Sequence, residues 1–245
     1  MKPVVVAAGV LLAASAGPAS AEMWHLPAGA YVRADLGAGF GQNLTFTDTN
    51  PGAVNAFLGP NAGVASSTGS SVLFGAGIGL RINPKFRVDA TFDYLPSLSQ
   101  SGSGTGAAAG FSGHADLDAA VAMANVYVDL DGFFPGLLGP VQPFLSAGIG
   151  VSSNTLGTAS AISKAGVPLT LSGATQTNFA WGVGVGAAYP LTPKLAVEAS
   201  YKYLNLGSLI TGTTATGPAG SAIVTAAKSG DLDVHTLALS LRYTF

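Results

Sequence analysis

The 245-residue sequence lacks cysteine and has very little charge. Its ten basic and twelve acidic residues make up 9% of the chain, against roughly 25% in soluble domains. So few charges cannot cover the water-facing surface of an ordinary soluble domain. Without cysteine no disulfide bond forms, so the fold depends on hydrogen bonds and packing. The formal net charge of -2 gives no basic excess of the kind that nucleic-acid binding requires, so no nucleic-acid partner is predicted.

Long hydrophobic runs are also missing, except at the N-terminus. A membrane-spanning helix needs roughly 20 consecutive apolar residues, and the apolar run at residues 3–16 is too short to be a membrane anchor. Lys2 precedes this run and small residues follow it as far as Ala21. This pattern predicts a secretory signal peptide at residues 1–21, with residues 22–245 forming a single exported domain.

Alternating apolar and polar residues recur along the exported part, in stretches of about ten residues. The last stretch is the clearest, because its large apolar residues all share one face: Leu237, Leu239, Leu241, Tyr243 and Phe245. Stretches that begin at Phe86 and Leu195 repeat the pattern, and five others fit it with less contrast. The alternation therefore predicts eight β-strands, at residues 31–41, 72–82, 86–94, 118–130, 143–153, 178–189, 195–203 and 236–245.

The connections between these strands alternate in length. Long segments rich in small and polar residues cover 42–71, 95–117, 154–177 and 205–230, whereas the other connections are short turns at 83–85 and 190–194 and a longer apolar turn at 131–142. An even strand number with long loops at one end is typical of transmembrane barrels. The sequence thus predicts an all-β fold: an eight-stranded antiparallel up-and-down transmembrane β-barrel with long extracellular loops and short periplasmic turns.

An internal repeat supports the strand assignment. Residues 83–95 (NPKFRVDATFDYL) match residues 192–204 (TPKLAVEASYKYL) with six identities in thirteen positions. Pro84 and Pro193 fall in the turns before the two strands, where a missing N–H does no harm. The two halves of the barrel are predicted to be variants of one four-strand unit.

Glycine indicates which face of each strand points inward. Glycines lie opposite the aromatic face in three strands, at Gly75, Gly77, Gly79, Gly148, Gly150, Gly182, Gly184 and Gly186. Facing water they would weaken the strands, whereas inside a narrow barrel they leave room for long side chains. Five basic and five acidic residues share this inward phase: Arg33, Asp35, Arg81, Arg87, Asp89, Asp93, Asp129, Glu198, Lys202 and Arg242. Because buried charges must be paired and the interior of such a barrel is filled by side chains, we expect a lumen plugged by salt bridges.

The outward face carries aromatic residues in two bands, as expected of girdles at the two membrane interfaces. The band toward the long loops holds Phe40, Phe74, Phe92, Tyr94, Phe179, Trp181, Tyr201 and Tyr203; the band toward the short turns holds Phe86, Tyr189, Tyr243 and Phe245. The alternative, a water-soluble barrel with aromatics in its core, is disfavoured by the glycines and by the scarcity of charge.

Histidine is too rare to support many catalytic or metal sites. His25 follows the cleavage site, and the other two histidines each share a strand end with two aspartates, in the sets His114, Asp116, Asp118 and Asp231, Asp233, His235. Each set could ligate a divalent cation, but Asp and His at exposed strand ends more often form a polar rim. The prediction is therefore no metal site and no cofactor.

The sequence gives little support for a catalytic site. Some outer-membrane barrels modify lipids with a serine, a histidine and an acid, and the serine must lie within hydrogen-bonding reach of its base. The outward residue two positions after His235 is Leu237. There is no Walker loop or zinc-ligand spacing, and no helix follows the Gly-x-Gly runs. The protein is not predicted to be an enzyme.

The chain resembles a known family. The eight alternating segments, residues 143–150 (PFLSAGIG) and residues 191–198 (LTPKLAVE) are similar to the small outer-membrane β-barrels of Gram-negative bacteria, of the opacity and surface-antigen type, related in fold to outer membrane proteins A and X. The terminal Tyr243 and Phe245 are similar to the signal that the barrel assembly machinery recognises. The resemblance implies an outer-membrane location and contact with outer-membrane lipid and lipopolysaccharide.

Three functions remain open at this point. The first is a monomeric structural or surface-interaction barrel whose loops contact host, phage or other cell-surface ligands. The second is a narrow passive porin-like channel for small solutes, which requires a water path beside the lumen charges. The third is an outer-membrane lipid-modifying enzyme. The balanced lumen charges favour the first.

Overall fold

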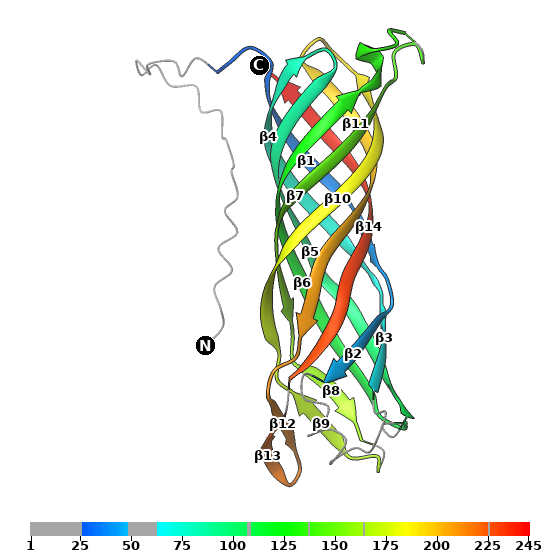
Figure 1. The fold of residues 1–245 in the computed structure, drawn as a ribbon, viewed down its shortest axis with the longest axis vertical. Helices are drawn as coiled ribbons and strands as arrows, with labels where there is room; N and C mark the ends of the chain where they lie inside the picture. The colour runs from blue at the N-terminus through cyan, green and yellow to red at the C-terminus, as the bar shows by residue number, and fades with distance from the viewer. Residues whose placement is uncertain (1–25, 49–62, 107–108, 137, 164, 225) are drawn as a thin grey trace.

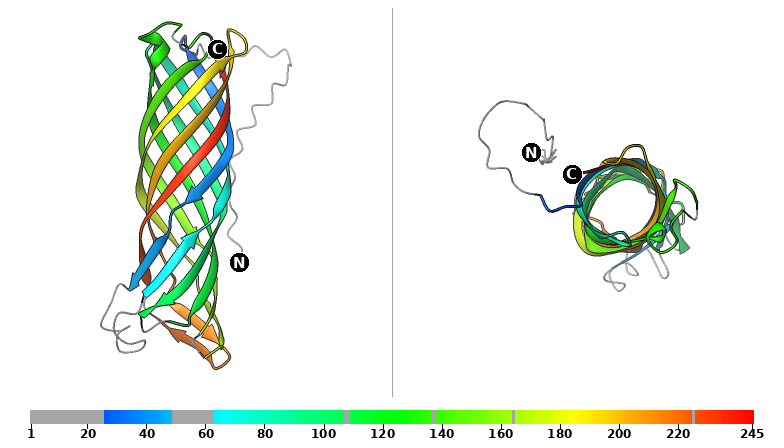
Figure 2. Two further views of the ribbon diagram at one scale, coloured as in Figure 1. Left: turned by 90° about the vertical axis from the view of Figure 1, so that its right-hand side faces the viewer. Right: turned by 90° about the horizontal axis from the view of Figure 1, so that it is seen from above.

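The computed structural model describes residues 26–48, 63–106, 109–136, 138–163, 165–224 and 226–245. Its main feature is a closed antiparallel ring of eight strands, hydrogen-bonded in the order β1, β4, β5, β6, β7, β10, β11, β14 and back to β1 (Figures 1 and 2). Their bounds are β1 (Ala30–Gly41), β4 (Ser70–Asn83), β5 (Phe86–Thr105), β6 (Ser112–Asp129), β7 (Gln142–Leu156), β10 (Ala174–Pro190), β11 (Leu195–Ile210) and β14 (Ala227–Thr244). The predicted eight-stranded barrel is confirmed.

Besides the eight ring strands, the described residues form a 3-10 turn and six short strands. A 3-10 turn, η2 (Leu130–Gly132), follows β6. No helix among the described residues has the length and apolar character needed to cross a membrane. The predicted signal peptide, residues 1–21, lies outside the described residues.

Six short strands gather at one end of the ring, which we call the hairpin end (Figure 1). They are β2 (Leu44–Asp48), β3 (Gly63–Thr68), β8 (Ala159–Ile162), β9 (Pro168–Leu171), β12 (Thr214–Gly217) and β13 (Gly220–Ile223). β2 pairs with β14 and β3 pairs with β5, so these two strands extend the barrel wall beyond β1 and β4. The opposite end, which holds the connections β4–β5, β6–β7 and β10–β11 and the C-terminus, is called the turn end. The part of the barrel between the turn end and the level of Leu95 is called the turn half, and the part beyond that level is called the hairpin half.

The strands are longer than the alternation predicts. β5 and β6 remain paired as far as Ser103 and Ser112, inside the segment 95–117 that was expected to be a loop. The pattern fails there because the register shifts between Leu95 and Leu98, which reverses the phase of every later residue in β5. Small Gly and Ser residues beyond this bulge hide the alternation as well.

The internal repeat corresponds to two equivalent turns. Asn83 and Thr192 each use a side-chain oxygen to accept hydrogen bonds from the backbone N–H groups two and three residues later, at 2.8–3.2 Å. Such a side-chain oxygen replaces a backbone acceptor and fixes a tight turn. Because β5 and β11 are four places apart in the ring of eight, equivalent residues of the repeat lie on opposite walls of the lumen.

Candidate functional site

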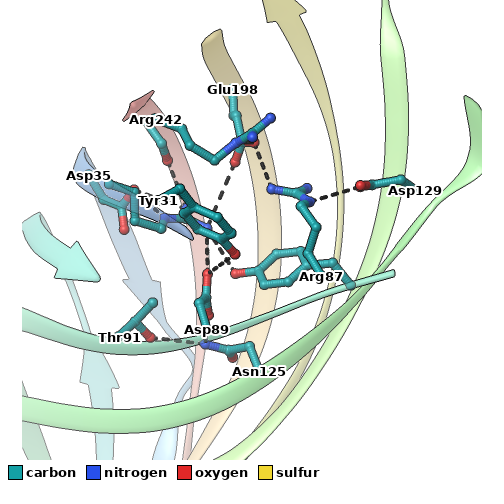
Figure 3. Close-up of polar contacts among 12 residues, drawn as sticks. Tyr31, Asp35, Arg87, Asp89, Thr91, Asn125, Asp129, Glu198 and Arg242 are labelled. Atoms are coloured by element: carbon teal, nitrogen blue, oxygen red, sulfur yellow. Dashed lines mark hydrogen bonds and ion pairs between the residues drawn. The ribbon is translucent and has the colours of Figure 1, made fainter. Parts of the chain in front are cut away.

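The lumen of the turn half contains a buried network of charges centred on Glu198 of β11 (Figure 3). Its carboxylate accepts hydrogen bonds from Arg87 of β5 at 2.9 Å and from Arg242 of β14 at 2.7 Å. Arg33 of β1 lies 3.8 Å from its other oxygen. The side chains of Glu198 and Arg87 are 0% exposed. One carboxylate on β11 thus contacts arginines of three other strands, the nearby β14 and β1 and, across the ring, β5.

Asp89, the repeat equivalent of Glu198, faces it from β5 and forms the second acidic centre. It accepts hydrogen bonds from Arg33 at 3.3 Å and from Tyr31 at 3.2 Å through one oxygen. Asn125 donates to the other oxygen at 2.8 Å. Arg33 also donates to Asp35 at 3.0 Å. A guanidinium presents five donors in a rigid plane, so Arg33 can connect both acidic centres.

A third acidic group, Asp129, extends the network toward the turn end. It accepts from Arg87 at 3.0 Å and forms an ion pair with Arg81 at 3.3 Å. The guanidinium of Arg87 also stacks over Tyr127 and Phe144, 4.6 and 5.1 Å from the ring centroids. Aromatic faces attract cations most strongly when both are desolvated, so these rings stabilise a charge that water cannot reach.

Eight of the ten charged residues assigned to the lumen are joined in this single network: Arg33, Asp35, Arg81, Arg87, Asp89, Asp129, Glu198 and Arg242. Its four arginines and four carboxylates balance. The remaining pair, Asp93 and Lys202, attract each other electrostatically, but no ion pair or hydrogen bond links them within the described chain. The alternation along each strand predicts that these charged residues share the face opposite the outward aromatics. Tyr31 and Tyr127 were missed because aromatics were assigned to the outer face, although each lies two residues from a lumen charge.

Above the charges, toward the hairpin end, an apolar plug fills the lumen. Its most buried side chains, each 0% exposed, are Leu95, Leu98, Leu117, Val121, Leu206, Leu232 and Val234. Water therefore has no access to these side chains. Sequence reasoning missed the plug because most of these residues fall in segments expected to be loops. The lumen thus contains two buried layers of opposite chemistry.

The outer face changes polarity at the same level. Along β14 toward the hairpin end, the outward residues change from apolar (Leu237) to polar (His235, Asp233 and Asp231). The inward residues change in the opposite sense, from polar Ser240 to apolar Val234. The turn half is thus apolar outside and polar inside, and the hairpin half is the reverse. This inversion is what a barrel requires when one half stands in lipid and the other in water.

The aromatic residues assigned to the girdles point away from the lumen. Ten of the twelve are exposed, and Tyr94 and Tyr203 are partly buried. The hydroxyl groups of these two tyrosines interact with Asp118 and Asp233 on the hairpin side. Each ring therefore has an apolar body beside the apolar band and a polar tip beyond it, as interfacial tyrosines do.

The two histidine sets lie on the outside of the barrel and differ in their contacts. His235 bonds to Tyr201 at 2.6 Å and to Gln42 at 2.8 Å. His114 lies 3.4 Å from the hydroxyl of Ser101 and 3.7 Å from the carboxylate of Asp116. Within the described ranges, no three His, Cys, Asp or Glu residues are grouped so that they could hold a metal ion.

Ser101, His114 and Asp116 form a serine–histidine–acid trio that sequence reasoning did not find, because Ser101 is brought opposite His114 only by the register after the bulge. Both distances exceed the roughly 2.6–3.2 Å of a nucleophile and its base. His114 and Asp116 are also more than half exposed. The trio lacks the shielding from water that a charge relay needs.

Known proteins that are similar to this chain include outer-membrane β-barrel proteins. A family model described as outer membrane protein beta-barrel domain matches residues 6–245. An uncharacterized protein of Brucella suis biovar 1 is 28% identical over 257 residues, which cover 89% of this chain and 85% of the relative. Outer membrane protein PagN of Salmonella typhimurium is 42% identical over 67 residues, 27% of this chain and 28% of PagN. Outer membrane protein OprG of Pseudomonas aeruginosa has a similar fold, with a TM-score of 0.52, 13% identity and coverage of 89% of this chain and 97% of OprG.

Proposed function

The chain belongs to the family of outer membrane protein beta-barrel domains, and we propose that it is a closed barrel with a structural and surface-interaction role. Its location is the outer membrane. Barrels of this kind keep their short turns in the periplasm and their longer connections outside the cell. The hairpin end therefore faces the exterior, where a ligand on a host cell, a phage or another cell surface reaches it.

The observation that carries this proposal is the closure of the lumen by two layers. A passive channel needs a continuous water path, yet the leucines of the plug have no water-accessible surface and Arg87 and Glu198 below them have none either. The charged layer and the apolar layer follow each other along the lumen, so a water path through the barrel would have to cross both. Both together disfavour the channel alternative.

The hairpin end offers a surface that a channel would not need. β8 pairs with β6, β9 with β8, and β12 with β9, so a small sheet extends from the barrel rim. A groove of about 660 Å³ runs beside these strands and is lined by His114, Ile162, Leu169 and Thr216, among others. Mixed apolar and hydrogen-bonding linings of this kind suit recognition of a macromolecular ligand.

The other partners belong to the same proposal. Lipid and lipopolysaccharide contact the outward aromatic bands, and the barrel assembly machinery recognises the C-terminal strand through Tyr243 and Phe245. A closed ring leaves no free strand edge along the turn half, which supports a monomer. We assign no enzymatic activity, because the Ser101 trio is open to water and its atoms lie too far apart.

Deleting residues 158–172 tests the surface role. Leu156 pairs with Ala174, and Gly157 and Gly173 are adjacent, since a Cβ on Gly173 would lie 2.8 Å from the carbonyl carbon of Gly157. The deletion therefore joins β7 to β10 through a two-residue Gly-Gly loop, which is a favoured hairpin connection. We expect the barrel to fold and the adhesion of displaying bacteria to cultured epithelial cells to be lost.

The control variant is Asp131→Asn, which changes the periplasmic end and should leave adhesion at the wild-type level. Surface amounts are matched by labelling intact cells. If the shortened barrel adheres as well as the wild type, the β8–β9 sheet is not the binding surface. If the wild-type protein adds nothing to the adhesion of the host strain, the surface-interaction role is wrong.

A further inference from the structure

The connection between β6 and β7 presents large apolar side chains outside the barrel. Phe133, Phe134 and Leu138 are 42%, 61% and 54% exposed. The other two connections at the turn end are short and contain no phenylalanine. We call these three residues the turn patch. Exposed apolar groups that lie together usually mark an interaction site.

The turn patch is held in place by its own backbone. The N–H of Phe134 donates to the carbonyl of Leu130 at 2.9 Å, and the N–H of Gly136 donates to the carboxylate of Asp131 at 2.9 Å. Gly132 packs so closely on the β4–β5 turn that a Cβ would lie 2.3 Å from the carbonyl oxygen of Pro84. The outward direction of the apolar side chains is therefore built into the turn.

The turn patch continues the aromatic girdle of the turn end. The ring of Phe133 meets the girdle residue Phe86 edge to face, with centroids 6.1 Å apart at 89°. The ammonium group of Lys85 lies 4.6 Å from the centroid of the same ring. In Figures 1 and 2 the β6–β7 connection projects sideways from the barrel wall. The turn patch thus extends outward over the membrane plane from an interface already in contact with lipid.

The outward charges differ between the two ends of the described barrel. The turn end carries Lys85 and Lys194 against Asp131, whereas the hairpin end carries four outward aspartates and one lysine: Asp116, Asp118, Asp231, Asp233 and Lys228. Lysine attracts the anionic phosphates of phospholipids, and its long apolar stem lets the ammonium group stay at the headgroup level while the stem lies on apolar surface. The turn end thus offers two lysines to phospholipid phosphates, whereas the described outward residues of the hairpin end are mostly acidic.

We propose that the turn patch is a phospholipid-binding anchor that inserts into the periplasmic leaflet of the outer membrane. Phe133, Phe134 and Leu138 lie at the boundary between headgroups and acyl chains, and Lys85 and Lys194 contact the phosphates above them. The anchor extends the barrel's hold on one leaflet sideways beyond the ring and fixes the depth of the turn end. It depends on the outer-membrane location and is independent of any surface ligand.

Tryptophan fluorescence in vesicles tests this anchor. The mature chain, with Trp24 and Trp181 replaced by Phe, is refolded into vesicles of phosphatidylethanolamine and phosphatidylglycerol after Phe134→Trp substitution. Because interfacial side chains lie about 5–10 Å into the headgroup–acyl boundary, we expect a blue-shifted emission. Lipids brominated near the headgroup end of the chain should quench it more than lipids brominated near the methyl end.

Ile223→Trp in the same background is the matched control, since Ile223 is the apolar residue at the hairpin end that is 91% exposed. Its emission should resist brominated lipid and be quenched by acrylamide in the water. Leu138→Trp provides a second probe should the Phe134 variant refold poorly. If both turn variants behave like the Ile223 variant, with emission quenched by acrylamide and not by lipid, the turn patch stands in water and a periplasmic protein becomes its partner instead.

Discussion

At the scale of single residues, Glu198 has the greatest consequence for stability. Three arginines surround its carboxylate, and neither it nor Arg87 has any exposed surface. Removing one member of a buried ion pair leaves its partner desolvated and uncompensated, which typically costs about 3–5 kcal/mol. The cost at Glu198 should lie in this range, because more than one guanidinium loses its acceptor.

Glu198→Gln tests this expectation while conserving shape. We predict that the free energy of unfolding falls by about 3–5 kcal/mol, measured by urea titration of the barrel in vesicles. Asp116→Asn makes the same chemical change at a side chain that is 65% exposed, and surface substitutions of this kind usually stay within about 0.5 kcal/mol. Equal effects of the two substitutions would show that the network contributes nothing specific.

The sequence could indicate the side on which each charged residue lies, because successive side chains of a strand point to opposite faces of the sheet. It could not indicate partners. Asp129 pairs with Arg87 and Arg81, from strands on either side of the β4–β5 turn, and Glu198 pairs with arginines from three strands. Which arginine a carboxylate pairs with depends on the stagger of the strands around the closed ring. The alternation along a single strand carries no information about that stagger.

At the scale of elements, the bulge in β5 decides where one environment ends and the next begins. Pro96 has no N–H, and Ser97 has a φ of 52°, which is uncommon for a residue other than glycine. The N–H of Ser97 donates to Asp118 of β6 at 2.8 Å instead of to the ladder. The bulge restores pairing with Leu98 inward, so the apolar plug continues above it. A loop prediction for this segment is natural, because its composition matches that of a loop.

The apolar plug should therefore behave as an independent core in the hairpin half. We predict that Leu117→Ala lowers the local stability of β5 and β6 beyond the bulge by about 2–5 kcal/mol, the usual cost of emptying a packed leucine site. Hydrogen exchange of the backbone amides at residues 98–105 and 112–117 measures this opening. The neighbouring Asp116→Ala faces solvent and should leave exchange unchanged. Equal protection in both variants would mean that the leucines do not hold this half together.

At the scale of the whole molecule, the same ring of strands is adapted to two solvents. Scarce charge and eight alternating stretches were sufficient to predict the closed ring, because both follow from strands standing in lipid. They were insufficient for the hairpin half, where water outside restores the ordinary arrangement of polar surface and apolar core. The inward face of β14 is polar in the turn half, where it carries Arg242, and apolar in the hairpin half, where it carries Leu232. One rule for which face is apolar therefore fails along the whole strand.

The charge network and the apolar plug together lead to a prediction about the conductance of the barrel. Arg87→Ser with Glu198→Ser removes a charge pair together and so leaves less uncompensated charge, and Leu98→Ser with Leu117→Ser opens the plug. Because each layer closes the lumen alone, we predict no resolvable conductance in a planar bilayer for the wild type or for either double variant. The quadruple variant should give discrete conductance steps, since only there does water span the lumen. Steps in the wild type would establish the channel alternative instead, and steps in one double variant alone would identify the layer that closes the barrel.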